Sequence, residues 1–210
     1  MSSSDSRSIN LTAVQSIRKA VLLVFIVAGV AFVLIGDSRW PSETFLHEAI
    51  EFFGLCLIVF CICGRMICTL YIGGRKIEVL VTDGPYSVVR NPLYSLSIVG
   101  ATGVGAQLGS FTLAIATGAV AYLVFLLVIL KEERVLLSRF GETYAAYLAR
   151  VPRLFPRFSY WRDVEKVEVN PRLVRITALD ASIFLLSIPL AEIFEHLHEI
   201  GLLPTLISLP

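Results

Sequence analysis

Charged side chains are scarce in this chain. Only 17% of its 210 residues are Asp, Glu, Lys or Arg, and 56% are hydrophobic. Soluble domains carry about 25% charged residues, so the composition excludes an ordinary water-soluble globular protein. The mean hydropathy of +0.76 instead indicates a protein embedded in a membrane.

Cysteines with the spacing of a metal or redox motif are also lacking. All four cysteines fall in one apolar run, at Cys56, Cys61, Cys63 and Cys68, and no two have C-x-x-C spacing. In a helix, Cys61 and Cys63 would point about 200° apart. We interpret the four as small packing residues and predict neither a disulfide framework nor a metal site.

Five apolar segments are predicted to cross the membrane as helices. Crossing a hydrocarbon core about 30 Å thick takes about 20 mostly apolar residues. The segments cover residues 20–36, 52–70, 92–108, 111–130 and 176–194. The third is rich in Ser, Gly and Thr, and it is included because it must cross if the charges are to sort to one side. The sequence thus predicts an all-α fold, a polytopic membrane helix bundle.

Lysine and arginine lie almost entirely on one side of this predicted bundle. Of the 18 Lys and Arg residues, only Arg39 falls on the opposite side. Cytoplasmic loops carry an excess of Lys and Arg, so we expect the N-terminus in the cytoplasm and the C-terminus outside. The basic face suits anionic lipid headgroups better than nucleic acid.

No internal repeat or low-complexity linker divides the chain. Residues 1–17 are predicted to form a disordered or interfacial tail, and residues 18–210 a single integral-membrane domain. No A-x-A-like cleavage site follows residues 20–36, so we expect this segment to be retained as an anchor. A bacterial inner membrane is the expected location.

Capping residues mark the predicted helix ends. Asn91 suits an N-cap and Pro92 a first helical residue. Ser110 is expected to cap the next helix, directly after a tight turn. That helix is expected to continue past the membrane over residues 111–140, where Gly141 can end it, and a shorter helix follows.

The junction at Arg90 is a candidate anion site. A helix N-terminus offers backbone N–H groups and the positive end of a dipole. Arg90 adds a planar fork suited to a carboxylate. The alternative is that Asn91 only caps the helix while Arg90 extends to lipid headgroups.

The paired carboxylates Glu132 and Glu133 are the second candidate. Five crossings bring them to the same face of the membrane as Arg90, where a carboxylate can bind an ammonium group or favour a sulfonium. Adjacent helical residues point about 100° apart, so only one can face the bundle fully. The alternative is that both are interfacial charges paired with Lys131 and Arg134.

These residues together resemble a known family. Arg90-Asn-Pro-Leu-Tyr94 is similar to the Arg-His-Pro-x-Tyr motif of the isoprenylcysteine carboxyl methyltransferases and phospholipid methyltransferases, which are integral-membrane enzymes. The family's C-terminal pattern is matched by three runs: Glu132-Glu133-x-x-Leu136, Phe140-Gly141-x-x-Tyr144-x-x-Tyr147 and Val151-Pro-Arg153. Gly103-Val-Gly105 resembles a Gly-x-Gly of the phospholipid enzymes, although close helix packing also explains it. The match covers residues 83–155.

The resemblance implies an S-adenosylmethionine-dependent methyltransferase that releases S-adenosylhomocysteine. A lipid or small lipophilic acceptor would enter from the bilayer and meet the cofactor in a pocket facing the cytoplasm. Catalytic roles are implied for Arg90, Tyr94 and Glu132. Cofactor contacts are implied for Tyr86, Arg90, Asn91, Tyr94, Gly103, Gly105, Glu133, Tyr144 and Tyr147, and a supporting role for Arg153.

One position departs from the family pattern, because Asn91 stands where the family has His. Asn can hydrogen-bond a cofactor but does not titrate near neutrality. Glu132 or Tyr94 would then have to take any proton that an amine, thiol or phenol acceptor loses, whereas a carboxylate acceptor needs no base. The alternative to an enzyme is a non-catalytic membrane accessory or scaffold protein on the same fold.

Further ionisable residues lie outside the motif. Asp180 and Arg65 fall inside predicted crossings, where an ionisable residue is a functional candidate. A structural pair between them, or interfacial solvation, is the alternative. Four residues recur on one helical face near the C-terminus, which we interpret as a solvated face rather than a metal site: Glu192, Glu195, His196 and Glu199.

Overall fold

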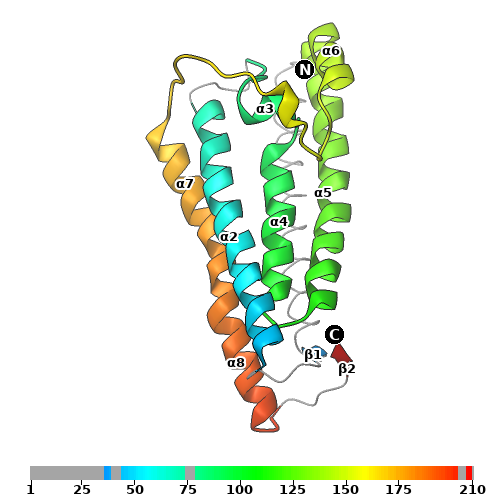
Figure 1. The fold of residues 1–210 in the computed structure, drawn as a ribbon. Coiled ribbons are helices and arrows are strands. Elements are labelled where there is room, and N and C mark those ends of the chain that lie inside the picture. Colours follow the sequence, from blue (N-terminus) through cyan, green and yellow to red (C-terminus); the bar gives the residue numbers. More distant parts are fainter. Residues whose placement is uncertain (1–35, 39–43, 74–78, 203–206, 210) are drawn as a thin grey trace, which may run out of the picture.

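The computed structural model describes residues 36–38, 44–73, 79–202 and 207–209. Most of these residues form long helices that run side by side as rods (Figure 1). The rods are α2 (Phe45–Ile72), α4 (Pro92–Ala106), α5 (Phe111–Phe140) and a broken rod of α7 (Pro171–Ser182), η2 (Ile183–Leu186) and α8 (Ser187–Glu199). The short elements are α3 (Pro85–Val88), α6 (Glu142–Arg150), η1 (Phe158–Tyr160) and the paired parallel strands β1 (Gly36–Ser38) and β2 (Ile207–Leu209).

The rods pack in a simple order. α4 lies between α2 and α5, and the rod from α7 to α8 lies along the other side of α2 (Figure 1). α3, α6 and the start of α4 lie at one end of the bundle, which we call the motif end. The start of α2 and the end of α8 lie at the opposite end, which we call the far end.

Among the described residues, three helical stretches are long and apolar enough to cross a membrane: Phe45–Ile72, Phe111–Phe140 and Pro171–His198. At 1.5 Å per residue the 28 residues of α2 extend over about 42 Å, more than the hydrocarbon thickness. The bundle's outward surface carries large exposed apolar side chains, among them Phe60, Ile115 and Leu127, as contact with lipid requires. The predicted all-α membrane helix bundle is confirmed.

Two of the five predicted crossings are not among these three helices. The segment 92–108 forms α4, a helix of only 15 residues, which reaches about 23 Å and is enclosed by longer helices. The predicted helix over residues 20–36 lies outside the described residues except for Gly36, which belongs to β1. The predicted tail over residues 1–17 also lies outside them.

The predicted helix ends at the α4–α5 turn and at the motif end are confirmed. α4 begins at Pro92, and the Ser110 hydroxyl accepts a hydrogen bond from the Leu113 amide at 3.3 Å at the start of α5. α5 continues to Phe140 and stops at Gly141, whose φ of 52° suits glycine. At the far end, α2 begins at Phe45 rather than at residue 52, because polar turns carry the helix beyond its apolar part.

The last rod is interrupted for a local reason. Its first helix is capped by Asn170, whose side chain accepts from the Arg172 amide at 3.1 Å. Pro189 has no N–H to donate to the carbonyl of Leu185, and its ring crowds that carbonyl. The turn just before it therefore tightens into the 3₁₀ segment η2 (Ile183–Leu186).

α2 and α4 approach each other through glycine. A Cβ on Gly103 would lie 2.6 Å from the Gly54 carbonyl oxygen, and a Cβ on Gly54 would lie 2.7 Å from the Gly103 carbonyl oxygen. The two backbones are thus in direct contact, as small residues allow in membrane helix pairs. Any side chain at either position must push the helices apart.

We expect Gly103→Ala to destabilise the folded protein by about 1–3 kcal/mol, the usual effect of overpacking a tight contact. The measurement is thermal unfolding of the purified protein in detergent. Ala119→Leu is the control, because it adds more carbon atoms at an exposed position of α5. An unfolding temperature for Gly103→Ala equal to that of the parent would mean that the two backbones do not touch.

Candidate functional site

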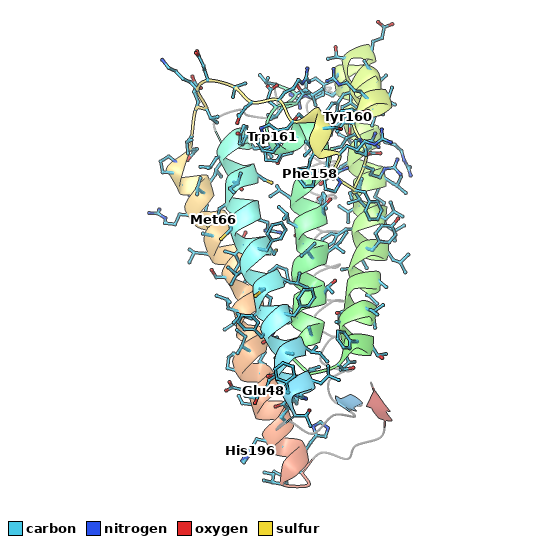
Figure 2. The ribbon with its side chains drawn as sticks, viewed as in Figure 1. Glu48, Met66, Phe158, Tyr160, Trp161 and His196 are labelled. Atoms are coloured by element: carbon cyan, nitrogen blue, oxygen red, sulfur yellow. The ribbon has the colours of Figure 1, made fainter. Side chains whose placement is uncertain are left out.

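The motif end gathers polar side chains from four parts of the chain. Arg90 and Asn91 lie between α3 and α4, Tyr94 lies in the first turn of α4, and Glu132 and Glu133 lie in α5. The segment after α6 adds Arg153. Figure 2 shows the same end of the bundle, where the labelled Phe158, Tyr160 and Trp161 also lie.

Glu133 is the centre of this arrangement. Its side chain is only 8% exposed, yet it meets two guanidinium groups. Arg90 donates from Nε to Oε1 at 3.1 Å, and Arg153 donates from Nε and Nη2 to Oε2 at 3.1 and 2.9 Å. A carboxylate is stable at such burial only when it is paired in this way.

Arg90 also holds the end of α6. Its Nη1 donates to the carbonyl oxygens of Leu148 at 2.6 Å and Val151 at 2.8 Å. These are acceptors that a helix C-terminus leaves without a partner inside the helix. The Arg90 amide donates to the Pro152 carbonyl at 2.8 Å, so backbone and side chain bind the same segment. Arg90 therefore joins α4, α5 and α6 rather than extending to headgroups.

Asn91 holds the predicted N-cap position of α4, but its side chain makes no cap hydrogen bond. Its Nδ2 instead donates to Glu133 Oε1 at 3.4 Å and to the Arg153 carbonyl at 3.2 Å. The side-chain Nδ2 of Asn91 is a donor, and the buried carboxylate of Glu133 is a stronger acceptor for it than water.

Glu132 has a separate partner. The hydroxyl of Tyr94 donates to Glu132 Oε1 at 2.7 Å. The Tyr94 ring lies 5.2 Å from the ring of Phe125, tilted by 42°. The two adjacent carboxylates thus turn to different groups, Glu133 into the arginine pair and the half-buried Glu132 toward Tyr94. Glu133 pairs with distant arginines and not with its neighbours Lys131 and Arg134.

Three of the predicted cofactor residues are buried tyrosines. Tyr144 and Tyr147 are 2% and 4% exposed and lie 5.9 Å apart, ring to ring. Tyr147 donates to the Tyr86 carbonyl at 2.7 Å, which ties α6 to α3. The Tyr86 hydroxyl is buried without a hydrogen-bond partner among the described residues.

Two predicted residues lie away from this cluster. Gly103 and Gly105 are about 14–17 Å along α4 from Tyr94. Both are buried where α4 meets its neighbours, Gly103 against α2 and Gly105 against Thr117 of α5. Their part in cofactor binding stays a prediction.

Arg65 and Asp180 do not pair. Arg65 donates from Nη1 to the hydroxyl of Ser97 in α4. Asp180 is exposed on α7, and no ion pair joins the two among the described residues.

Two residues of the site were not identified from the sequence. Phe125 packs against Tyr94, and Ser95 donates from its hydroxyl to the Leu154 carbonyl at 2.8 Å. Phe and Ser are both ordinary residues in an apolar helix, so neither position stands out in the sequence. Only the spacing of Ser95 from Asn91, one helical turn, could have pointed to it.

The charges at this end suit a zwitterionic ligand that carries an additional cation. Two arginines and two glutamates lie within one cluster, and an aromatic pair lies beside the half-buried carboxylate Glu132. A carboxylate can bind an ammonium group, and an aromatic face attracts a cation such as a sulfonium. These arginines, glutamates and aromatic rings therefore fit a ligand of the S-adenosylmethionine type.

The chain belongs to the family of integral-membrane methyltransferases that comprises the isoprenylcysteine carboxyl and phospholipid enzymes. The family model for phospholipid methyltransferase matches residues 64–143, from the end of α2 to the start of α6. Together with its membrane-spanning helices, this makes the protein an integral-membrane methyltransferase at the level of general class.

Curated relatives match over much of the chain. It is 33% identical to the cobalt-zinc-cadmium resistance protein CzcN of Cupriavidus metallidurans, over 90% of this chain and 85% of the relative. It is 35% identical to the nickel-cobalt-cadmium resistance protein NccN of Alcaligenes xylosoxydans xylosoxydans, over 83% of this chain and 81% of the relative. The protein-S-isoprenylcysteine O-methyltransferase of Schizosaccharomyces pombe is 37% identical over 39% of this chain and 35% of its own. No solved structure matches.

Glu133→Gln should destabilise the protein by about 3 kcal/mol, because two guanidinium groups at a buried position lose their counter-charge. Thermal or denaturant unfolding in detergent measures this. Glu165→Gln removes the same charge at an exposed position of the α6–α7 connection and should change stability little. Similar unfolding of both variants would show that Glu133 is not the electrostatic centre of this end.

Alkaline pH should loosen α6. Burial raises the pKa of Tyr144 to about 12, and it raises the pKa of Tyr147 further. An unfolded tyrosine ionises near pH 10, so above that pH the unfolded state releases protons that the folded state retains. Stability is thus full below about pH 10 and falls as the pH rises toward 12.

Unfolding measured between pH 8 and pH 11.5 tests this. Tyr144→Phe should flatten the decline, because it removes one of the two phenols. Tyr160→Phe, at a more exposed tyrosine, should leave the decline as it is. An unchanged slope in Tyr144→Phe would contradict the burial of its hydroxyl.

Proposed function

We propose that this protein transfers a methyl group from S-adenosylmethionine to a lipid or a small lipophilic acceptor at the motif end of the bundle. The contact between the Tyr94 hydroxyl and Glu132 Oε1 at 2.7 Å carries this proposal. It places a proton donor and a carboxylate together where α5 leaves the apolar layer. A bundle that served only as a scaffold would have no evident need for that pair.

The residues that would hold the cofactor follow from their charges. Glu132 would meet the ammonium group or the sulfonium, and the Tyr94–Phe125 ring pair would line the same place. Arg153 is the arginine of the cluster with more exposure, at 40%, so it would reach the cofactor carboxylate more readily than Arg90. Bound S-adenosylmethionine would supply an electrophilic methyl group, and no metal is needed for such a transfer.

The protein's own contribution would be positioning and one proton. Holding an acceptor in line with the methyl group can lower a barrier by several kcal/mol, about 7–11 in the best cases. An amine, thiol or phenol acceptor must also lose a proton, which Glu132 Oε1 would take directly or through the Tyr94 hydroxyl. Asn91 cannot take this part because its amide does not titrate, and it is already bonded to the Glu133 cluster.

The acceptor would come from the bilayer. α5 presents exposed Leu123 and Leu127 within three turns of Glu132, so an apolar molecule could reach this level of the helix from the lipid. We rank lipids and small apolar molecules ahead of prenylated cysteine, because no feature of the chain suits a protein substrate. Membrane lipids are thus the proposed partners, and nucleic acid is not.

The motif end would face the cytoplasm. Residues 131–175, which carry ten of the chain's 18 Lys and Arg residues, belong to this end of the bundle or lead away from it. A cytoplasmic excess of Lys and Arg is the general rule for membrane proteins. On this ground we place the active site on the cytoplasmic side, in a bacterial inner membrane, where soluble S-adenosylmethionine is made and available.

We also propose that the methyl transfer serves tolerance to divalent metals. Two relatives that match over more than four-fifths of this chain are named as resistance proteins for cobalt, cadmium and either zinc or nickel. A host lacking such a protein, complemented with the parent or with Glu132→Gln, would test this by growth in cobalt, zinc and cadmium salts. Rescue by the variant at the parent's level would separate metal tolerance from the motif end and favour an accessory role.

Methyl transfer itself is tested with purified protein in nanodiscs, methyl-labelled S-adenosylmethionine and a total lipid extract. We expect labelled product in the organic phase, and a turnover about 100-fold lower in Tyr94→Phe with cofactor affinity little changed. Tyr160→Phe is the matched control, since among the described residues the hydroxyl that it removes bonds only Arg157, at the same end.

The result distinguishes the acceptors. Full activity in Tyr94→Phe would indicate either a carboxylate acceptor, which loses no proton, or an acceptor whose proton Glu132 takes directly. Absence of cofactor binding to the folded parent would contradict the proposed function and favour the scaffold.

A further inference from the structure

The far end of the bundle holds a second cluster of ionisable side chains. His47 lies in the first turn of α2, Glu51 lies one turn later on the same side, and Glu195 comes from α8. His47 Nε2 lies 3.2 Å from Glu51 Oε1 and 3.0 Å from Glu195 Oε1. One ligand atom from each of the three lies within 4.8 Å of the other two.

We propose that His47, Glu51 and Glu195 form a binding site for a divalent transition-metal ion such as Zn²⁺ or Co²⁺. This site lies at the end of the bundle opposite to the motif end (Figure 1). Metal binding there does not depend on methyl transfer at the motif end.

The spacing of the ligand atoms fits such an ion. Zinc lies about 2.0–2.2 Å from His nitrogen and carboxylate oxygen, and two ligands at a tetrahedral angle are then about 3.4 Å apart. The two observed separations of 3.0 and 3.2 Å are slightly shorter. A small outward movement of two glutamate side chains would admit the ion between them and the ring.

The ring nitrogen of His47 is shared between two carboxylates. A single ring nitrogen, His47 Nε2, faces two carboxylate oxygens but can carry only one proton. The side chain is 3% exposed, so little water reaches it. An ion bound through the Nε2 lone pair would contact the nitrogen and both oxygens at once, with the ring proton on the other nitrogen.

The described residues at this end carry more carboxylates than basic side chains. Residues 44–64, 91–130 and 176–202 contain no Lys or Arg, and these segments build the far half of the described bundle. Glu48 and Glu192 add further negative charge one turn from Glu51 and Glu195. Figure 2 shows Glu48 and His196 at this same end. A bound cation would stabilise such partly buried carboxylates.

The surrounding structure holds the histidine ring in place. Gly109, with φ of 60°, packs so closely on His47 that any side chain there would collide with the ring. Gln107 donates from Nε2 to the Glu51 carbonyl at 2.9 Å, which fixes the first turns of α2 against the end of α4. A ligand held by packing and by its neighbours loses less entropy on binding an ion.

A second histidine lies on α8. His198 follows Glu195 by three residues and so lies on the same side of the helix. Its Nδ1 lies 2.9 Å from the Phe194 carbonyl, and its Nε2 is buried without a hydrogen-bond partner among the described residues. Of the C-terminal face considered in the sequence, the cluster uses Glu195 and neither Glu192 nor His196.

The test is metal binding to the full-length protein in nanodiscs after removal of metal with a chelator. Zn²⁺ is measured by competition with a chromophoric chelator and Co²⁺ by its visible absorption. We expect one ion per chain with the spectrum of nitrogen and oxygen ligands, and at least tenfold weaker binding in Glu195→Gln. Glu192→Gln, which removes an exposed carboxylate one turn away, should bind as the parent does.

Several results would overturn the proposal. Equal affinity in Glu195→Gln and the parent would do so, as would absence of stoichiometric binding. Sulfur-to-cobalt charge transfer would show instead that exposed Cys56 or Cys63 binds the ion. If Glu195→Gln does not fold, Glu51→Gln takes its place with the same criterion. Zn²⁺ should also raise the unfolding temperature of the parent and not that of the variant.

Discussion

The placement of Glu133 between Arg90 and Arg153 is the interaction on which the motif end depends. The carboxylate is on α5, one arginine precedes α4, and the other follows α6, so one buried charge joins three elements that lie far apart in the sequence. Because Glu133 and Arg90 are buried, neither of these two charges is stable there without its partners. Asn91 adds its amide to the same carboxylate and Arg90 its fork to the carbonyls of α6. Glu132 is thereby left to interact with Tyr94.

The middle of the bundle is made differently. α2 and α4 meet through Gly54 and Gly103, whose backbones touch, and α4 meets α5 through Gly105. Such contacts leave no room for a ligand and few polar groups, so chemistry is confined to the two ends. Within the motif-end cluster the charges balance, Arg90 and Arg153 against Glu132 and Glu133. At the far end the carboxylates outnumber the basic residues, since the described segments there contain neither Lys nor Arg. A zwitterionic cofactor suits the first environment and a metal cation the second.

The family match and the whole-chain relatives account for different parts of the molecule. The phospholipid methyltransferase model spans residues 64–143, which includes Arg90, Tyr94 and both glutamates of α5. His47 and Glu195 lie outside it, on the start of α2 and on α8. The relatives named for metal resistance cover nearly the whole chain. The methyltransferase core and the far end can therefore have separate roles, which the two sets of variants distinguish.

The sequence alone determined the membrane class, the helix ends at Pro92 and Phe140 and the identity of most motif-end residues, because hydropathy, caps and a motif are local properties. It did not determine which side chain meets which. Asn91 occupies the predicted N-cap position, but its side chain bonds Glu133, since only the folded chain brings a buried carboxylate to it. The sequence implied only a supporting role for Arg153, whereas the fold after α6 places its side chain on Glu133 of α5. His47 and Glu195 are 148 residues apart, so no spacing rule could join them. Packing of α8 along α2 decides that contact, because only tertiary structure sets which helix faces meet.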